Sequence, residues 1–272
     1  MMGYVRIIPK SFFDFFRDGG LMLAGSLSYF SMMAIVPFCL FLVTIFGYFL
    51  GGEKQFYHFF SARLTSYFPS VTHGITEELG RIITYKGIGK LSLILYGILS
   101  YGLFTSLEAA TNAIFKIKVK RSFFVSLVFS LVVVTSIIAF FLVSFAATSM
   151  ISMLVPIQEF LPGLKIGKIS ALFIRFVVPF FIMFITVAML YKLLPKKRIR
   201  VPDALSGALF TAVFIEVAKH LFTLYVLNVF KFGTIYGPLS ALVIFLLWVF
   251  YSASIFLIGA EVVHNLEGKR GK

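Results

Sequence analysis

Residues 21–50 read LMLAGSLSYFSMMAIVPFCLFLVTIFGYFL, thirty consecutive positions without a charged side chain. A helix needs about 20 mostly apolar residues, at about 1.5 Å of rise each, to cross the hydrocarbon core of a bilayer. This stretch is long enough to cross it with residues to spare. We therefore predict a membrane-spanning helix over 21–50.

Five more stretches of the same kind follow along the chain. We predict membrane-spanning helices over about 91–115, 123–155, 169–194, 204–230 and 234–260, which makes six in all. Of the 272 residues, 60% are hydrophobic and 13% are charged, whereas a soluble domain carries about 25% charged residues. This composition excludes a soluble enzyme and a disordered chain. The predicted fold is an all-α polytopic membrane protein, in which residues 1–272 form a single membrane domain.

The distribution of basic residues predicts the orientation of these helices. The chain has 25 Lys and Arg against 11 Asp and Glu, and basic clusters follow the second and fourth predicted helices, at 116–121 and 192–200. Short loops rich in Lys and Arg stay in the cytoplasm. We therefore predict a multi-pass protein with both termini cytoplasmic, and anionic lipid head groups as partners of the basic loops. Because no folded basic domain surrounds these clusters, we expect no nucleic-acid partner.

Two segments outside the six stretches have apolar residues at helical spacing. Residues 1–20 are predicted to form a cytoplasmic amphipathic helix that lies in the membrane interface and turns its basic residues toward the head groups. The long outer loop, residues 51–90, is predicted to contain amphipathic helices as well, one of them over 55–68. This loop is either a lid or partner surface, or a pair of helices that rests on the outer leaflet or caps the bundle.

The fifth predicted helix contains the most unusual charges, because a charged side chain inside a span costs about 2.5–3.5 kcal/mol to place. Glu216 is followed by Lys219 and His220 at i+3 and i+4, which puts all three on one side of the helix. Small residues precede Glu216 at four-residue steps, so we expect this acid to face the bundle interior. It is either a polar substrate, ion or proton site, in which Glu216 accepts and Lys219 neutralises, or half of a structural ion pair.

A second polar pair lies near the cytoplasmic end of the second predicted helix. Glu108 and Asn112 are one turn apart, and Glu108 either partners a basic group on a neighbouring helix or lies near water. Both are candidates for a substrate or ion path. The sequence has no zincin, nucleophile-elbow or P-loop motif, and its four histidines are scattered. We therefore expect no enzyme activity, no metal site and no cofactor.

Several motifs stand in an order that is typical of one family. Residues 26–30 read SLSYF, 107–115 read LEAATNAIF and 191–195 read YKLLP. Eight single positions go with them: Pro37, Gly207, Tyr225, Tyr236, Gly237, Trp248, Gly259 and Glu261. Over nearly its whole length the chain thus resembles the YihY/BrkB family of bacterial inner-membrane proteins. The resemblance implies a six-helix fold, a structural role for the eight positions, and envelope-related or lipid-related transport. No paired carboxylates or histidines support the ribonuclease label that this family once had.

The favoured function is a transporter or lipid translocator of the cell envelope, whose polar cluster on the fifth helix contacts the polar part of its substrate. The alternative is a non-transporting scaffold that recruits envelope proteins, or a second copy of itself, through the outer loop or the basic loops. An intramembrane enzyme is least favoured, because the chain has no nucleophile or metal constellation. A cavity that reaches Glu216 favours the translocator, whereas a closed, dry bundle favours the scaffold.

Overall fold

The computed structural model describes residues 7–49, 88–117, 168–229 and 240–270, together with 124–126, 128–129 and 133. The regular structure of these residues is helical. The helices, in chain order, are α2 (Ile7–Arg17), α3 (Gly20–Phe49), α6 (Ile88–Ile114), α8 (Lys168–Leu193), α9 (Val201–Val229) and α11 (Ser240–Arg270). Short helical pieces lie among the described residues between 124 and 133.

Four of the predicted helices agree with the observed ones to within three residues at either end: 21–50 with α3, 91–115 with α6, 169–194 with α8 and 204–230 with α9. Pro37 lies within α3 and Pro179 within α8. The predicted outer loop at 51–90, most of the predicted helix at 123–155, and the motif positions Tyr236 and Gly237 lie outside the described residues.

Two described segments, Val201–Phe222 and Leu242–Lys269, are long and apolar enough to cross a membrane. Two further apolar segments, Gly20–Ala34 and Pro179–Leu193, are shorter than that limit within the described part of the chain. The all-α fold is thus confirmed for the described residues, and the number of six spans stays a prediction.

The predicted position of the C-terminal end of the last helix is wrong. We expected this helix to end at residue 260, where the apolar run stops, but α11 continues to Arg270. The extension stays helical because it is covered. Glu261 and Asn265 are buried there, and α2 packs against α11.

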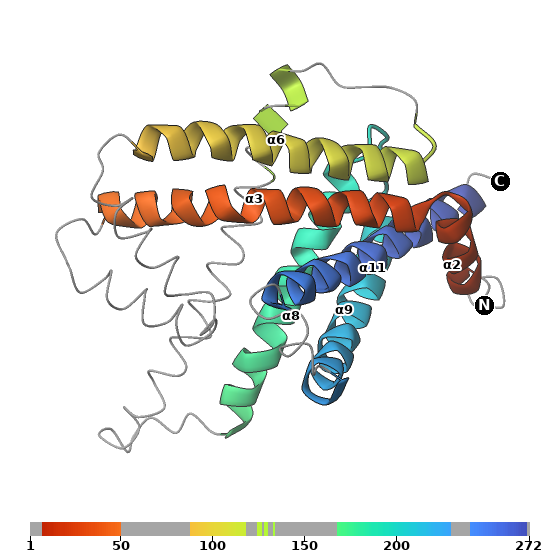
Figure 1. Cartoon of the computed structure of the whole chain (residues 1–272). Helices are drawn as coiled ribbons and strands as arrows, with labels where there is room; N and C mark the ends of the chain where they lie inside the picture. The colour runs from red at the N-terminus through yellow and green to blue at the C-terminus, as the bar shows by residue number, and fades with distance from the viewer. Residues whose placement is uncertain are drawn as a thin grey trace.

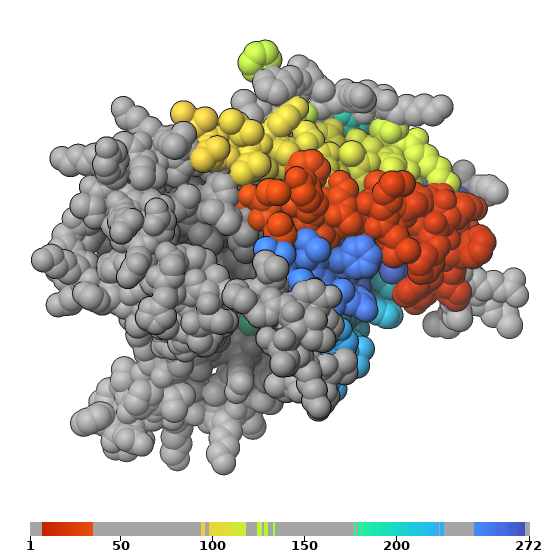
Figure 2. All heavy atoms as spheres, in the orientation of Figure 1, coloured from red at the N-terminus to blue at the C-terminus, as the bar shows by residue number. Residues whose placement is uncertain are grey.

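Two helical pairs form the body of the described structure. α3 and α6 lie side by side and run antiparallel, and α8 and α9 form a second antiparallel pair (Figure 1). α11 packs against α3 from the first pair and against α9 from the second. In the space-filling view α3 lies between α6 and α11 (Figure 2). α11 is therefore the element that joins the two pairs.

The amphipathic helix predicted within residues 1–20 is observed as α2, next to the C-terminal end of α11 (Figure 1). The two faces of α2 differ in burial. One face is buried and consists of Ile7, Ser11, Asp14 and Phe15. The other leaves Ile8, Phe13 and Phe16 exposed. After α2, Gly19 adopts a φ of 75°, a conformation that glycine takes without steric cost, and the chain turns directly into α3.

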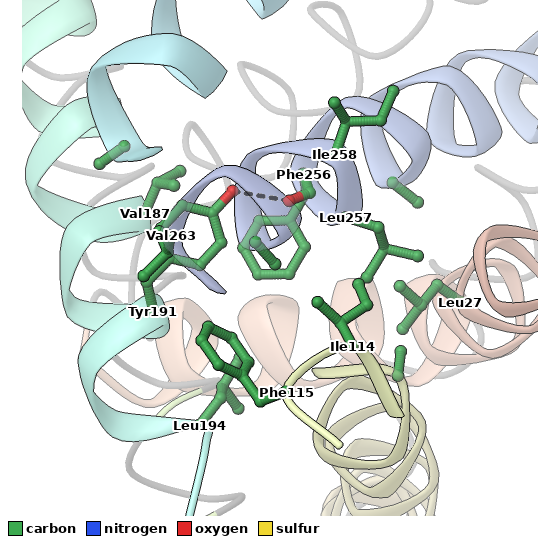
Figure 3. Packing of buried hydrophobic residues seen from close by; sticks show 14 of the residues in the cluster. Leu27, Ile114, Phe115, Val187, Tyr191, Leu194, Phe256, Leu257, Ile258 and Val263 are labelled. Carbon is green, nitrogen blue, oxygen red and sulfur yellow. Dashed lines mark hydrogen bonds between the residues drawn. The ribbon is translucent and has the colours of Figure 1, made fainter. Parts of the chain in front are cut away.

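The hydrophobic core lies where α8 and α11 meet the ends of α3 and α6. Figure 3 shows Tyr191 of α8 beside Phe256 of α11, with Leu257, Ile114 and Leu27 completing the contact. The rings of Tyr191 and Phe256 are stacked, with their centroids 4.9 Å apart. Large apolar side chains from four helices thus fix the position of α11.

Candidate functional site

The ion pair predicted on the fifth helix is present. On α9 the Lys219 Nζ atom lies 2.6 Å from Glu216 Oε2, and the His220 Nε2 atom lies 4.0 Å from Glu216 Oε1. The spacing of three and four residues brings the three side chains to one side of the helix, as predicted. Within this group, Glu216 is therefore the acceptor for Lys219.

The pair does not lie in the packed interior. Ala208 and Ala212, on the same small-residue stripe as Glu216, are fully buried. One turn further on, the side chains of Glu216 and Lys219 are 31% and 44% exposed, and that of His220 is 72% exposed. We expected Glu216 to face the bundle interior, and the described helices that pack on α9 leave this turn only partly covered.

Glu108 and Asn112 form a separate group on α6. Glu108 is buried, and the Ser126 hydroxyl donates a hydrogen bond to its Oε2 atom at 3.4 Å. The Asn112 carbonyl accepts a hydrogen bond from the amide of Ile117 at the end of the helix. Because α6 packs against α3 and α11, the structure does not bring these two residues together with Glu216.

A buried hydrogen-bonded tyrosine explains two of the motif glycines. The Tyr191 hydroxyl donates to the Phe256 carbonyl oxygen at 2.6 Å (Figure 3). The same hydroxyl lies 2.6 Å from the Thr211 hydroxyl. This joins α8, α9 and α11 at one point. A Cβ atom at Gly259 would meet both hydroxyl groups, and one at Gly207 would meet Val263. Both positions are therefore glycine because the helices approach too closely for a larger residue.

The motif aromatics contribute contacts between α9 and α11. The Trp248 ring of α11 lies 5.1 Å from the Phe222 ring of α9, and Phe222 lies 6.3 Å from Tyr225. Trp248 is half-buried. The sole tryptophan of the sequence thus packs against a neighbouring helix.

The sequence did not reveal a buried polar group between α2 and α11. Asn265 of α11 donates hydrogen bonds to Asp14 Oδ2 and to Ser11 Oγ of α2, both at 3.1 Å. Asp14 also accepts from Arg17 at 2.9 Å. Glu261, one turn before Asn265, is fully buried. The motif contained Glu261, but the contact of Asn265 with α2 could be found only by recognising that Ser11 and Asp14 share a helical face with apolar residues.

The helix ends at this side of the bundle are tied by ion pairs. Lys116, after α6, lies 3.5 Å from Asp18, between α2 and α3. Lys197, before α9, lies 3.1 Å from Glu267 near the end of α11. The ends that the basic clusters assign to one membrane side therefore meet at one end of the molecule. Within the described residues, no group of three or more His, Cys, Asp or Glu side chains is placed to hold a metal ion.

Comparison with known proteins identifies relatives over most of the chain. The sequence profile of the family described as Virulence factor BrkB matches residues 12–272. A UPF0761 membrane protein of Pseudoalteromonas translucida (strain TAC 125) is 30% identical over 246 residues, which cover 88% of this chain and 78% of that protein. A UPF0761 membrane protein of Haemophilus influenzae (strain 86-028NP) is 26% identical over 249 residues, 90% of this chain and 88% of that protein.

Some relatives are considerably longer. A UPF0761 membrane protein of Rhodospirillum centenum (strain ATCC 51521 / SW) is 28% identical over an alignment of 277 positions, gaps included, which covers 100% of this chain but 59% of that protein. The chain therefore spans about three-fifths of the length of this relative. No solved structure matches the chain.

Proposed function

Because the chain belongs to the virulence factor BrkB family of membrane proteins, we propose that it is a transporter or lipid translocator of the bacterial inner membrane. In this proposal the Glu216–Lys219 pair of α9 contacts the polar part of the substrate. Both termini and the basic clusters at 116–121 and 192–200 are cytoplasmic.

The observation that supports this proposal most is the accessible ion pair in an apolar helix. Glu216 and Lys219 lie within the segment Val201–Phe222, which is apolar enough to span a membrane, and yet their side chains are 31% and 44% exposed. Charged residues within spans face protein interior or a water-filled cavity, because lipid cannot solvate them. A pair that protein covers only in part is therefore best accommodated along a hydrated groove.

The chemistry of the pair suits a zwitterionic head group. The Lys219 ammonium group can bind a phosphate oxygen and the Glu216 carboxylate can bind an amine, so that the internal pair is exchanged for two contacts with the substrate. The exposed apolar residues on the same helix, including Leu209, Val213 and Leu221, would remain in contact with acyl chains. Such an arrangement lets a head group cross while its chains stay in lipid.

A fluorescent-lipid assay tests the proposal. The purified chain is reconstituted into vesicles that contain a phosphatidylethanolamine tracer with a fluorophore on one acyl chain, so that its amine stays free, and a membrane-impermeant reductant is added. We expect the reductant to bleach tracer of both leaflets with the wild-type chain, but only outer-leaflet tracer with the Glu216→Gln/Lys219→Met double variant.

Lys197→Met is the matched control, because Lys197 is also half-exposed and paired with an acid, but lies outside the proposed groove. In vesicles with this variant, the reductant should bleach the tracer of both leaflets, as it does with the wild-type chain. Wild-type vesicles that bleach no more tracer than protein-free vesicles would refute lipid translocation.

A further inference from the structure

In the described part of the chain, no counter-charge pairs with the carboxyl group of Glu261. The residue follows the apolar run of α11 directly and is 0% exposed, and neither carboxyl oxygen has a hydrogen-bond partner among the described residues. A carboxyl group in such surroundings either pairs with a cation or holds a proton, because an isolated buried carboxylate is costly. The charged groups around Glu261 decide which of the two applies.

The charged groups that act on Glu261 come from the elements around the end of α11 (Figure 1). They are Asp14 and Arg17 of α2, Asp18 after α2, and Lys116 after α6. His264 lies one turn further along α11 itself. The described part of α3 contains no charged residue, and Lys197, from the segment before α9, pairs with Glu267 instead.

Both basic groups are already engaged with aspartates. The Arg17 Nη2 atom lies 2.9 Å from Asp14 Oδ1, and the Lys116 Nζ atom lies 3.5 Å from Asp18 Oδ2. Their side chains are also half-exposed, so their charges are screened by solvent on one side. Lys10 of α2 is likewise exposed and lies 4.0 Å from Asp14 Oδ2. The three cations thus pair with the two aspartates, and none pairs with the carboxylate of Glu261, the most deeply buried of the three.

We propose that the carboxyl group of Glu261 is a proton-binding site, enclosed between α2 and α11, at which a bound proton neutralises a carboxylate that no cation pairs with. A metal ion is a poorer occupant, because no group of three metal-ligating side chains is assembled in the described residues. Proton release leaves the carboxylate in place and passes the proton to water, with no other bond broken.

The bound proton has a structural consequence for α2. This helix is held to α11 by the hydrogen bonds from Asn265 to Asp14 and Ser11. When Glu261 loses its proton, a negative charge appears behind Asp14, on the same face of α11 as Asn265. The repulsion weakens the docking of α2. The inference does not depend on lipid translocation, because it concerns only the charge of Glu261 and the position of α2.

Carbodiimide labelling tests the site directly. Dicyclohexylcarbodiimide reacts with protonated carboxyl groups in apolar surroundings, and peptide mass spectrometry of the full chain in detergent locates the adduct. We expect an adduct on Glu261 that is lost as the pH rises, and no adduct there in Glu261→Gln. Glu267→Gln is the control, because Glu267 lies on the same helix but is paired with Lys197, and it should label as the wild type does.

Two labelling results would overturn the proposal. One is a wild-type chain without an adduct on Glu261 at any pH at which it stays folded. The other is an adduct whose yield falls on addition of sodium at constant pH but does not respond to pH, which would assign the site to a metal cation.

Hydrogen exchange gives a second measurement, and the wild-type chain alone is enough to test the link between Glu261 and α2. After correction for the intrinsic pH dependence of amide exchange, the amides of 7–17 should exchange faster at high than at low pH in the wild type. Glu267→Gln should behave in the same way, and Glu261→Gln, where it folds, should lose the difference. Equal corrected exchange of α2 at both pH values in the wild type would overturn the link between Glu261 and α2.

Discussion

Tyr191 shows how single residues determine the approach of three helices. Its hydroxyl group joins Thr211 of α9 to the backbone of α11 at Phe256, and the space beside it is just large enough for Gly259. The sequence marked Gly207 and Gly259 as structural positions through a resemblance alone. The structure gives the physical reason, which is close contact of α9 with α11. No pattern within one helix could have supplied that reason, because the contacting atoms come from different helices.

A substitution at this contact should therefore be costly. In Gly259→Ala the new methyl group would meet the hydroxyl groups of Tyr191 and Thr211. We expect the free energy of unfolding to fall by about 1–3 kcal/mol, the usual cost of overpacking. Gly268→Ala, on the same helix, is the control, because a Cβ atom there meets nothing within 4 Å. Thermal unfolding in detergent separates the two, and equal melting temperatures for both variants would contradict the tyrosine contact.

Among whole elements, α3, α8 and α9 begin and end close to where the apolar runs do, because burial in an apolar medium requires a continuous run of apolar residues. α11 breaks this correspondence. Its last turns contain Glu261, His264 and Asn265, polar residues that we expected to lie in a tail after the helix. These turns are helical because α2 covers them. Similarly, the spacing of Glu216 and Lys219 predicted their pairing, but the side to which they turn depends on where α8 and α11 stop covering α9.

The end of α6 offers a test of an element boundary. Lys116 has a φ of 56°, and the bonds Lys116 N–H to Ala113 and Ile117 N–H to Asn112 close the helix around it. A residue other than glycine costs about 1–2 kcal/mol in this conformation. Lys116 also has its ion pair with Asp18.

We expect Lys116→Ala to be less stable than Lys116→Gly by about 1 kcal/mol, because both lose the ion pair but only alanine keeps the steric cost. Chemical denaturation of the two variants measures the difference. Lys116→Ala being the more stable of the two would mean that the left-handed turn is not present.

Across the whole molecule, two antiparallel helix pairs joined by α11 bring the basic helix ends to one side (Figure 1). The family assignment made from the motifs is confirmed by the profile match over residues 12–272. The sequence could not predict the angle between the pairs or the burial of Glu261. Both arise from contacts between elements far apart in the chain, and apolar content alone does not encode them.

The proposed orientation predicts which positions reagents reach from outside. In a background without Cys39, a single cysteine at Ser70, in the predicted outer loop, should react with an impermeant thiol reagent in intact spheroplasts. A cysteine at Ser122, after the basic cluster at 116–121, should react only after lysis. The reverse pattern would invert the topology.

The central claim is that the α9 pair lies along a hydrated groove within the membrane, and cysteine accessibility in vesicles tests it most directly. Lys219→Cys and Val217→Cys place a thiol at positions that are both about half-exposed but lie on opposite sides of α9. We expect a charged, water-soluble thiol reagent to label position 219 rapidly and position 217 hardly at all, because lipid covers the latter. Equal rates at both positions, or no labelling at 219, would contradict the claim.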